Sequence, residues 1–126
     1  MLKKDIKKKS QEMLRDAEIL FDNKRYDGAV YICGYALELG LKNCICKRLN
    51  WSEYPISQKY KSFRTHDFDV LLNLTGKGGK IKTQFFAEWA VSLTWKPENR
   101  YYKARIIKKG DAQLMITSVK KLLKKI

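Results

Sequence analysis

The 126 residues include 27 Lys and Arg against 13 Asp and Glu, which gives a formal net charge of +14. Hydrophobic residues make up 44% and charged residues 32%, a globular composition that excludes an intrinsically disordered chain. The length predicts one domain over residues 1–126. The charge predicts attraction to a polyanion such as RNA or DNA, or to an acidic protein partner, and the alternative is a lysine-rich surface that serves only solubility.

The three cysteines, Cys33, Cys44 and Cys46, lie in one apolar segment. An odd count without a secretory context favours reduced thiols and an intracellular protein. Cys44 and Cys46 have no second cysteine pair and no nearby histidine, so we expect buried small side chains, no metal site and no cofactor. No segment resembles a signal peptide or reaches the apolar length of a bilayer span, which predicts a soluble, cytoplasmic protein without membrane contact.

Residues 3 to about 22 form the first predicted helix, because their apolar side chains recur at helical spacing. The stripe consists of Leu14, Ala17, Leu20 and Phe21, with Met13 and Ile6 as extensions. The lysines before Ser10 predict a frayed, solvated start, and "DNKRYD" predicts a turn.

The second predicted helix, from about Tyr26 to Leu49, is apolar around much of its circumference, which indicates packing on more than one side. Glu38 and Lys42 have the i, i+4 spacing of an ion pair. Each glycine inside a helix costs about 1 kcal/mol relative to alanine. The small residues Ala29, Cys33, Ala36 and Gly40 form a strip, so we expect a close approach by neighbouring helices, whereas Gly28 is assigned to the preceding turn.

The remaining chain predicts shorter elements. Residues 50–65, with Pro55, form a loop, and "HDFDVLLNL" forms a third helix capped by Thr65 or His66, with Asp67 and Asp69 in its first turn. "TGKGGK" separates it from a fourth helix, "KTQFFAEWAVSL", and Asp111 is the expected N-cap of the last helix. The apolar stripe of that last helix is Leu114, Met115, Val119, Leu122 and Leu123. The predicted fold is an all-α, up-and-down bundle of four to five helices.

The segment "YDGAVYICGYALELGLKNCI" resembles the signature helix of the HEPN family, the higher eukaryotes and prokaryotes nucleotide-binding domain. The matching residues are Tyr26, Ala29, Gly34, Tyr35, Ala36, Glu38 and Lys42. "RTHDFDVLL" resembles the family's later His-Asp-Leu helix start through His66, Asp67, Leu71 and Leu72, and "WKPENRYY" is similar to a stretch found in one branch. The resemblance covers about residues 10 to 123, and it implies a HEPN-like helical bundle that forms a homodimer.

Many HEPN proteins are endoribonucleases in toxin–antitoxin or defence systems, with an R-x(4–6)-H motif shared between two subunits. This chain lacks that motif, because no arginine lies at the required distance before its one histidine, His66. The resemblance therefore implies a branch without the usual active site. His66 has three interpretations: a residue at the start of the third helix, a ligand-binding residue in a basic setting, or a general base.

The candidate residues for nucleotide or RNA binding combine cations with tyrosines, which grip phosphate and stack on bases. They are Lys61, Arg64, His66, Arg100, Tyr101, Tyr102, Lys103 and Arg105. The preferred hypothesis is a non-catalytic module that binds nucleotide, RNA or a partner protein, and the resemblance implies a minimal nucleotidyltransferase as the partner in a toxin–antitoxin or defence pair. The alternatives are a divergent metal-independent endoribonuclease using Arg64, His66 and Arg100, and a structural homodimeric adaptor.

Overall fold

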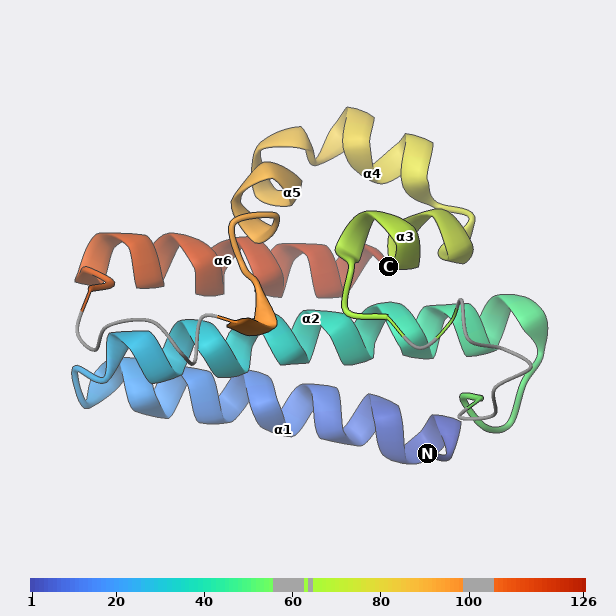
Figure 1. Cartoon of the computed structure of the whole chain (residues 1–126), viewed down its shortest axis with the longest axis horizontal. Helices are drawn as coiled ribbons and strands as arrows, with labels where there is room; N and C mark the ends of the chain where they lie inside the picture. The colour runs from blue at the N-terminus through green and yellow to red at the C-terminus, as the bar shows by residue number, and fades with distance from the viewer. Residues whose placement is uncertain (56–62, 64, 99–105) are drawn as a thin grey trace.

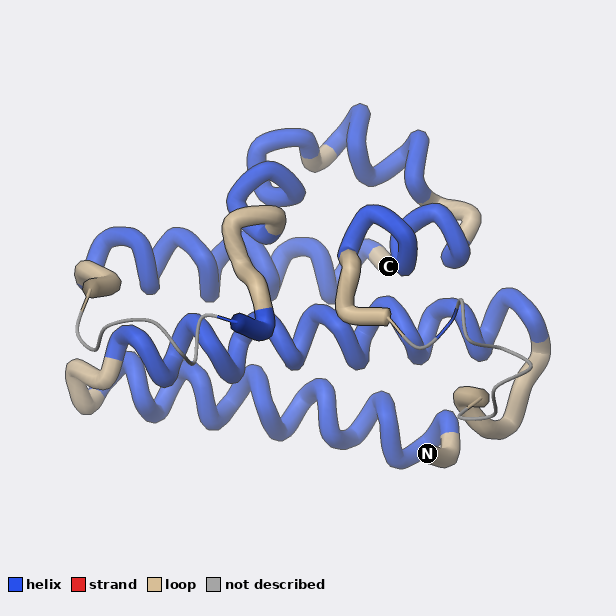
Figure 2. Tube along the Cα trace, in the orientation of Figure 1, coloured by secondary structure: helices blue, strands red, loops and turns tan. Residues whose placement is uncertain are grey.

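The structure is a computed structural model that describes residues 1–55, 63, 65–98 and 106–126. This part of the chain has six helices, which are α1 (Lys3–Asp22), α2 (Tyr26–Leu49), α3 (Phe68–Thr75), α4 (Gly78–Gln84), α5 (Phe86–Ser92) and α6 (Lys109–Lys125). No strand occurs among the described residues (Figure 2). The predicted all-α fold is confirmed, and so are the bounds expected for the first two helices. None of the described helices has the length and apolarity needed to cross a membrane.

Helix α2 is the centre of the bundle, with α1 along one side, α6 along another and α3 over part of the rest (Figure 1). α1 and α2 are antiparallel, and a short turn that includes Lys24 at φ 62° joins them. α3, α4 and α5 return the chain toward the start of α2, so α6 runs in the same direction as α2 (Figure 1). This arrangement confirms the expectation that α2 packs on several sides.

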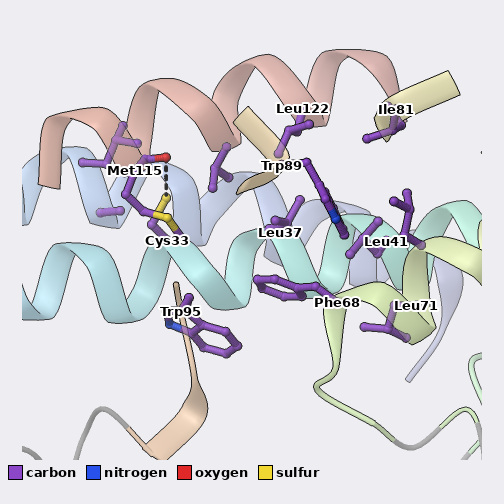
Figure 3. Packing of buried hydrophobic residues seen from close by; sticks show 14 of the residues in the cluster. Cys33, Leu37, Leu41, Phe68, Leu71, Ile81, Trp89, Trp95, Met115 and Leu122 are labelled. Carbon is purple, nitrogen blue, oxygen red and sulfur yellow. Dashed lines mark hydrogen bonds between the residues drawn. The ribbon is translucent and has the colours of Figure 1, made fainter. Parts of the chain in front are cut away.

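The hydrophobic core surrounds α2. Its largest fully buried members on that helix are Leu37, Leu41 and Ile45. Figure 3 shows Met115 of α6 facing Cys33, with the Cys33 thiol 4.0 Å from the Met115 carbonyl oxygen. Around these residues pack, among others, Ile6, Ala17, Phe68, Leu71, Leu72, Ile81, Trp89, Trp95, Val119 and Leu122. Burial of this apolar surface is the main term that stabilises the fold.

Two glycines of α2 permit close approaches. A Cβ on Gly34 would lie 2.1 Å from a ring atom of Trp95, and a Cβ on Gly40 would lie 2.2 Å from Cδ2 of Leu123 in α6. The expected reason for glycine in this helix is therefore confirmed for Gly40, whereas the neighbour of Gly34 is a tryptophan beyond the end of α5. The expectation for Gly28 is wrong, because this residue lies in the first turn of α2 with only Leu20 near its Cβ position, at 3.6 Å.

The lysine-rich start of the chain is part of α1, which begins at Lys3. Lys4, Lys7, Lys8 and Lys9 are exposed, which agrees with the expected solvated start. Ile6 is 1% exposed, and the Ser10 hydroxyl donates a hydrogen bond to the Ala36 carbonyl oxygen at 2.7 Å. The first turns of α1 can pack against α2 despite their lysines, because the charged ends of these side chains reach water. Ile6 and Ser10 lie on the face of α1 that is buried.

The cap of α3 is neither Thr65 nor His66. Asp67 is the N-cap, and its Oδ1 accepts hydrogen bonds from the backbone N–H groups of Asp69 at 3.0 Å and Val70 at 3.2 Å. Thr65 supports the cap indirectly, since its hydroxyl accepts a hydrogen bond from the Asp67 N–H at 3.0 Å. His66 therefore takes no part in capping α3.

The expected fourth helix is two helices. Phe85, at φ −128° and ψ 39°, separates α4 from α5, and Gly78 and Gly79 begin α4 instead of ending a helix. The interruption lets Phe85 enter the core at 8% exposure and leaves Phe86 72% exposed.

The last helix begins earlier than predicted. Its N-cap is Lys108, and Asp111 lies in its first turn, where a carboxylate still favours the helix dipole. Leu114, expected in the apolar stripe, is 53% exposed, and Ile116 is buried. The residues that α6 buries are thus Ala112, Met115, Ile116, Ser118, Val119 and Leu122.

Candidate functional site

The site is built on Glu38, an acidic side chain in the middle of the central helix that is only 4% exposed. Its Oε2 accepts a hydrogen bond from Lys42 Nζ at 3.1 Å, which confirms the predicted i, i+4 pair. Its Oε1 lies 2.5 Å from Nδ1 of His66. A buried carboxylate is costly without such partners, so Lys42 and His66 are what allow Glu38 to occupy this position.

His66 joins this carboxylate to the surface. The residue lies just before α3, and its side chain is 54% exposed. With Nδ1 directed at Glu38, that nitrogen donates the hydrogen bond, and Nε2 is the ring nitrogen left for other chemistry. Nε2 has no hydrogen-bond partner among the described residues. An imidazole oriented in this way can bind an anion or transfer a proton at Nε2.

One aromatic ring, that of Tyr35, contacts His66, and further rings pack behind it. The Tyr35 ring meets the His66 ring edge-on, with centroids 6.1 Å apart, and Tyr35 also packs edge-on against Trp95. Trp95 is held in turn by a hydrogen bond from its Nε1 to the Tyr31 carbonyl oxygen at 3.2 Å. These contacts limit the orientations of the histidine ring, because each neighbour is itself fixed by packing.

Lys42 is the other side-chain partner of Glu38 and is 14% exposed. Its ammonium lies 5.2 Å from the centroid of the Tyr54 ring, a cation–π distance. The Tyr54 hydroxyl donates a hydrogen bond to the Phe63 carbonyl oxygen. Burial, with further contributions from Cys46 and Glu38, raises the pKa of Tyr54 well above its usual value, so this hydroxyl stays protonated as a donor.

The structure tests few of the predicted binding residues. Of the candidates, His66 is described, while Lys61, Arg64, Arg100, Tyr101, Tyr102, Lys103 and Arg105 lie outside the described residues. The pairing of Glu38 with His66 was not among the predictions from the sequence. The signal was available, because a glutamate in a helix that is apolar on several sides must find cations or hydrogen-bond donors.

The cysteines contribute packing. Cys33, Cys44 and Cys46 are all free and buried, as predicted. Burial is the main cause that raises the pKa of Cys33 to about 12, with a smaller contribution from Glu18, and burial also raises the pKa of Cys46. These two thiols are therefore poor nucleophiles. Within the described ranges, no group of three or more His, Cys, Asp or Glu side chains is placed to hold a metal ion.

Comparison with protein families identifies a match over nearly the whole chain. The family model described as "HEPN domain" matches residues 4–126, a range that includes all the helices described above except Lys3 of α1, and the residues Glu38, Lys42 and His66. A search of the curated proteins gave no match, and a search of the solved structures gave none either.

Proposed function

Because the chain belongs to the HEPN domain family of nucleotide- and RNA-related helical modules, we propose that it is a non-catalytic module that binds the phosphates of RNA or a nucleotide. The observation that carries this proposal is the half-exposed His66 ring, which the buried Glu38 carboxylate holds by Nδ1. In the imidazolium form, Nε2–H donates to a phosphate oxygen while Nδ1–H keeps its hydrogen bond to Glu38, so the ring binds phosphate at little entropic cost. The formal charge of +14 supplies the long-range attraction.

The other predicted binding residues belong to this proposal. Lys61 and Arg64 precede His66 in the sequence, and Arg100 to Arg105 add cations and tyrosines.

We further propose that the module functions with a nucleotidyltransferase, as one half of a toxin–antitoxin or defence pair. Co-purification of the two chains from one host would support this pairing.

Substitution of His66 tests the binding site. We expect His66→Asn to weaken binding of a fluorescein-labelled 12-nucleotide RNA by about tenfold, since a charge-assisted hydrogen bond contributes roughly 1.5 kcal/mol or more. Asparagine retains an N–H close to the position of Nδ1, so the bond to Glu38 and the melting temperature should be preserved. Fluorescence anisotropy in low salt measures the dissociation constants. Wild-type affinity in the asparagine variant, or no binding by the wild type in about 50 mM salt, contradicts the proposal.

The same Glu38–His66 pair supports the second candidate, a metal-independent endoribonuclease. Nε2 would take the proton from a ribose 2′-hydroxyl, the 2′-oxygen would attack phosphorus, and the departing 5′-oxygen would receive a proton from the imidazolium. Arg64 and Arg100, which lie outside the described residues, are the proposed cations for the phosphorane. The RNA from the binding experiment distinguishes the candidates: fragments ending in a 2′,3′-cyclic phosphate, absent with His66→Asn, identify an enzyme, and intact RNA identifies a binding module.

We propose that the module is a homodimer, and that the surface of α5 forms its interface. Phe86 and Ala90 of α5 and Leu93, its C-cap residue, are exposed at i, i+4 and i+7, which is the spacing of one helix face, and Phe86 is 72% exposed. Exposed apolar side chains at this spacing are typical of an association site. A dimer formed through this surface is also what the alternative function, a structural homodimeric adaptor, requires.

Substitution of Phe86 tests this interface. Light scattering at micromolar concentration should give a dimer for the wild type and a monomer for Phe86→Glu, because the new charge cannot be desolvated in an apolar contact. Ile19→Glu is the matched control, since Ile19 is also exposed, at 53%, but lies on α1. A monomeric wild type, or a dimeric Phe86→Glu variant, contradicts the proposal.

A further inference from the structure

A second site lies where α1 begins and α2 ends, at one end of the bundle (Figure 1). An open hollow of about 500 Å³ occurs there, a volume within the usual range of small-ligand sites. Its lining residues are Leu2, Lys3, Lys4, Asn50, Trp51 and Ser52. None of these residues belongs to the Glu38–His66 site or to the candidates from the sequence analysis.

Backbone contacts hold the two sides of the hollow together. Asn50 adopts the left-handed conformation at φ 56°, which turns the chain back from the end of α2. The Lys3 N–H then donates to the Ser52 carbonyl oxygen at 2.9 Å, and the Tyr54 N–H donates to the Met1 carbonyl oxygen at 3.0 Å. The lysines of the first turn of α1 therefore have a defined position relative to Trp51.

Positive charge is concentrated at this end of the molecule. Exposed cations of the first turns of α1 and the last turn of α2 gather here: Lys4, Lys7, Lys8, Lys9, Lys47 and Arg48, with the partly exposed Lys3 beside them. No lysine among the first nine residues takes part in an ion pair with another described residue. Asp16, Glu18, Asp22 and Asp27 lie in the half of the α1–α2 pair next to the turn that joins the two helices. Asp5 and Glu53 are the acidic residues at the end with the hollow, where Glu53 Oε1 lies 3.7 Å from the N-terminal ammonium of Met1.

From this arrangement we infer that the hollow binds one nucleotide of a single-stranded RNA, with the base against Trp51 and the backbone phosphate beside Lys3 and Lys4. An aromatic surface next to cations is what single-stranded nucleic acid requires, because a base stacks on the ring while lysine neutralises the phosphate. An acidic protein would use the lysines but has no need for the indole. A duplex hides its base faces and cannot use the indole at all.

The inference rests on the proposed function and makes its ligand more specific. A line of contacts connects the two sites: Lys42 lies over the Tyr54 ring, Tyr54 bonds to Phe63, and Phe63 meets Trp51 edge-on with ring centroids 5.0 Å apart. These contacts pass through Tyr54, which is only 5% exposed, so they relate the two sites through the interior. A strand of several nucleotides is long enough to reach both sites, whereas a mononucleotide reaches one. Affinity is therefore expected to rise with the length of the RNA.

The test measures binding of fluorescein-labelled oligouridylate of 12 nucleotides to the full chain. Trp51→Leu keeps an apolar side chain against Phe63 but removes the stacking surface, and we expect about tenfold weaker binding. The pair Lys3→Gln and Lys4→Gln should weaken binding and reduce the slope of log K against log salt by about two. The matched control is Lys24→Gln with Arg25→Gln, two adjacent exposed cations in the turn between α1 and α2 at the opposite end of the bundle, which should change affinity by less than about twofold.

Tryptophan fluorescence gives a second readout on the unmodified protein. Trp89 and Trp95 are 3% and 4% exposed, so quenching of the emission by unlabelled oligouridylate should come from Trp51 and should be absent in Trp51→Leu. Quenching in the wild type remains informative even if the variant does not fold. Uridine monophosphate should quench only at much higher concentration.

The outcomes separate the inference from the proposed function. Equal effects of the Lys3–Lys4 and Lys24–Arg25 double variants, or wild-type affinity in Trp51→Leu, overturn the inference, and loss of binding by His66→Asn in the same series leaves the proposed function intact. If the Lys3→Gln and Lys4→Gln pair weakens RNA binding but Trp51→Leu does not, the surface recognises only charge. That result also overturns the inference. A wild type that binds no RNA overturns both.

Discussion

Replacing Gly34 by alanine is expected to destabilise the protein by about 3 kcal/mol, although alanine is the better helix former by about 1 kcal/mol. The added Cβ would lie 2.1 to 2.3 Å from three atoms of the Trp95 ring, far inside van der Waals contact. The ring cannot move aside easily, because it stacks on Phe68 with centroids 5.1 Å apart and bonds to the Tyr31 carbonyl oxygen. Alanine therefore displaces a buried tryptophan and the packing around it.

Thermal unfolding measures this effect, and a loss of about 3 kcal/mol corresponds to a melting temperature lower by roughly 10 °C. Gly28→Ala is the matched control in the same helix. Its Cβ would make an ordinary contact with Leu20 at 3.6 Å, so this variant should be as stable as the wild type or slightly more stable. Gly40→Ala should lie between the two, because the Leu123 side chain it meets can rotate. A Gly34→Ala variant as stable as Gly28→Ala would contradict this account of the packing.

Replacing Glu38 by glutamine is expected to cost about 3 kcal/mol and also to weaken RNA binding. Glutamine keeps the size of the side chain but removes its charge, which leaves Lys42 largely buried beside a neutral amide. The hydrogen bond that orients His66 is weakened at the same time, because the carboxylate acceptor is replaced. Stability and ligand affinity should therefore fall together, unlike in His66→Asn, where only affinity falls.

Denaturant unfolding of Glu38→Gln, with and without Lys42→Met, isolates the ion pair. The double variant should recover much of the lost stability, since it no longer contains an uncompensated buried cation. Glu18→Gln provides the surface control: Glu18 pairs with Lys120 at 3.5 Å with both side chains more than 40% exposed, and such pairs contribute less than about 1 kcal/mol. If Glu38→Gln is as mild as Glu18→Gln, the buried carboxylate does not organise the site.

Local pattern was sufficient where a property depends on neighbours along one helix. The bounds of α1 and α2, the Glu38–Lys42 pair and the expectation that Gly40 admits a neighbour all follow from helical spacing. Local pattern was insufficient at α5, because the backbone at Phe85 decides which of two adjacent phenylalanines is buried. The N-cap of α3 was also ambiguous, because Thr65, His66 and Asp67 are three consecutive polar residues. The structure shows that Asp67 is the N-cap, since its side chain accepts hydrogen bonds from the Asp69 and Val70 N–H groups.

The sequence by itself determined that this chain is a basic, all-helical protein with a mostly buried central helix and a resemblance that the HEPN family match confirms. Only the tertiary structure decided that His66 and Glu38, which are 28 residues apart, share a hydrogen bond, and that Lys3, Lys4 and Trp51 line one hollow. The reason is that helical periodicity specifies which face of a helix is buried. It does not specify which distant side chain packs against that face, since that choice depends on how the connecting segments return the chain.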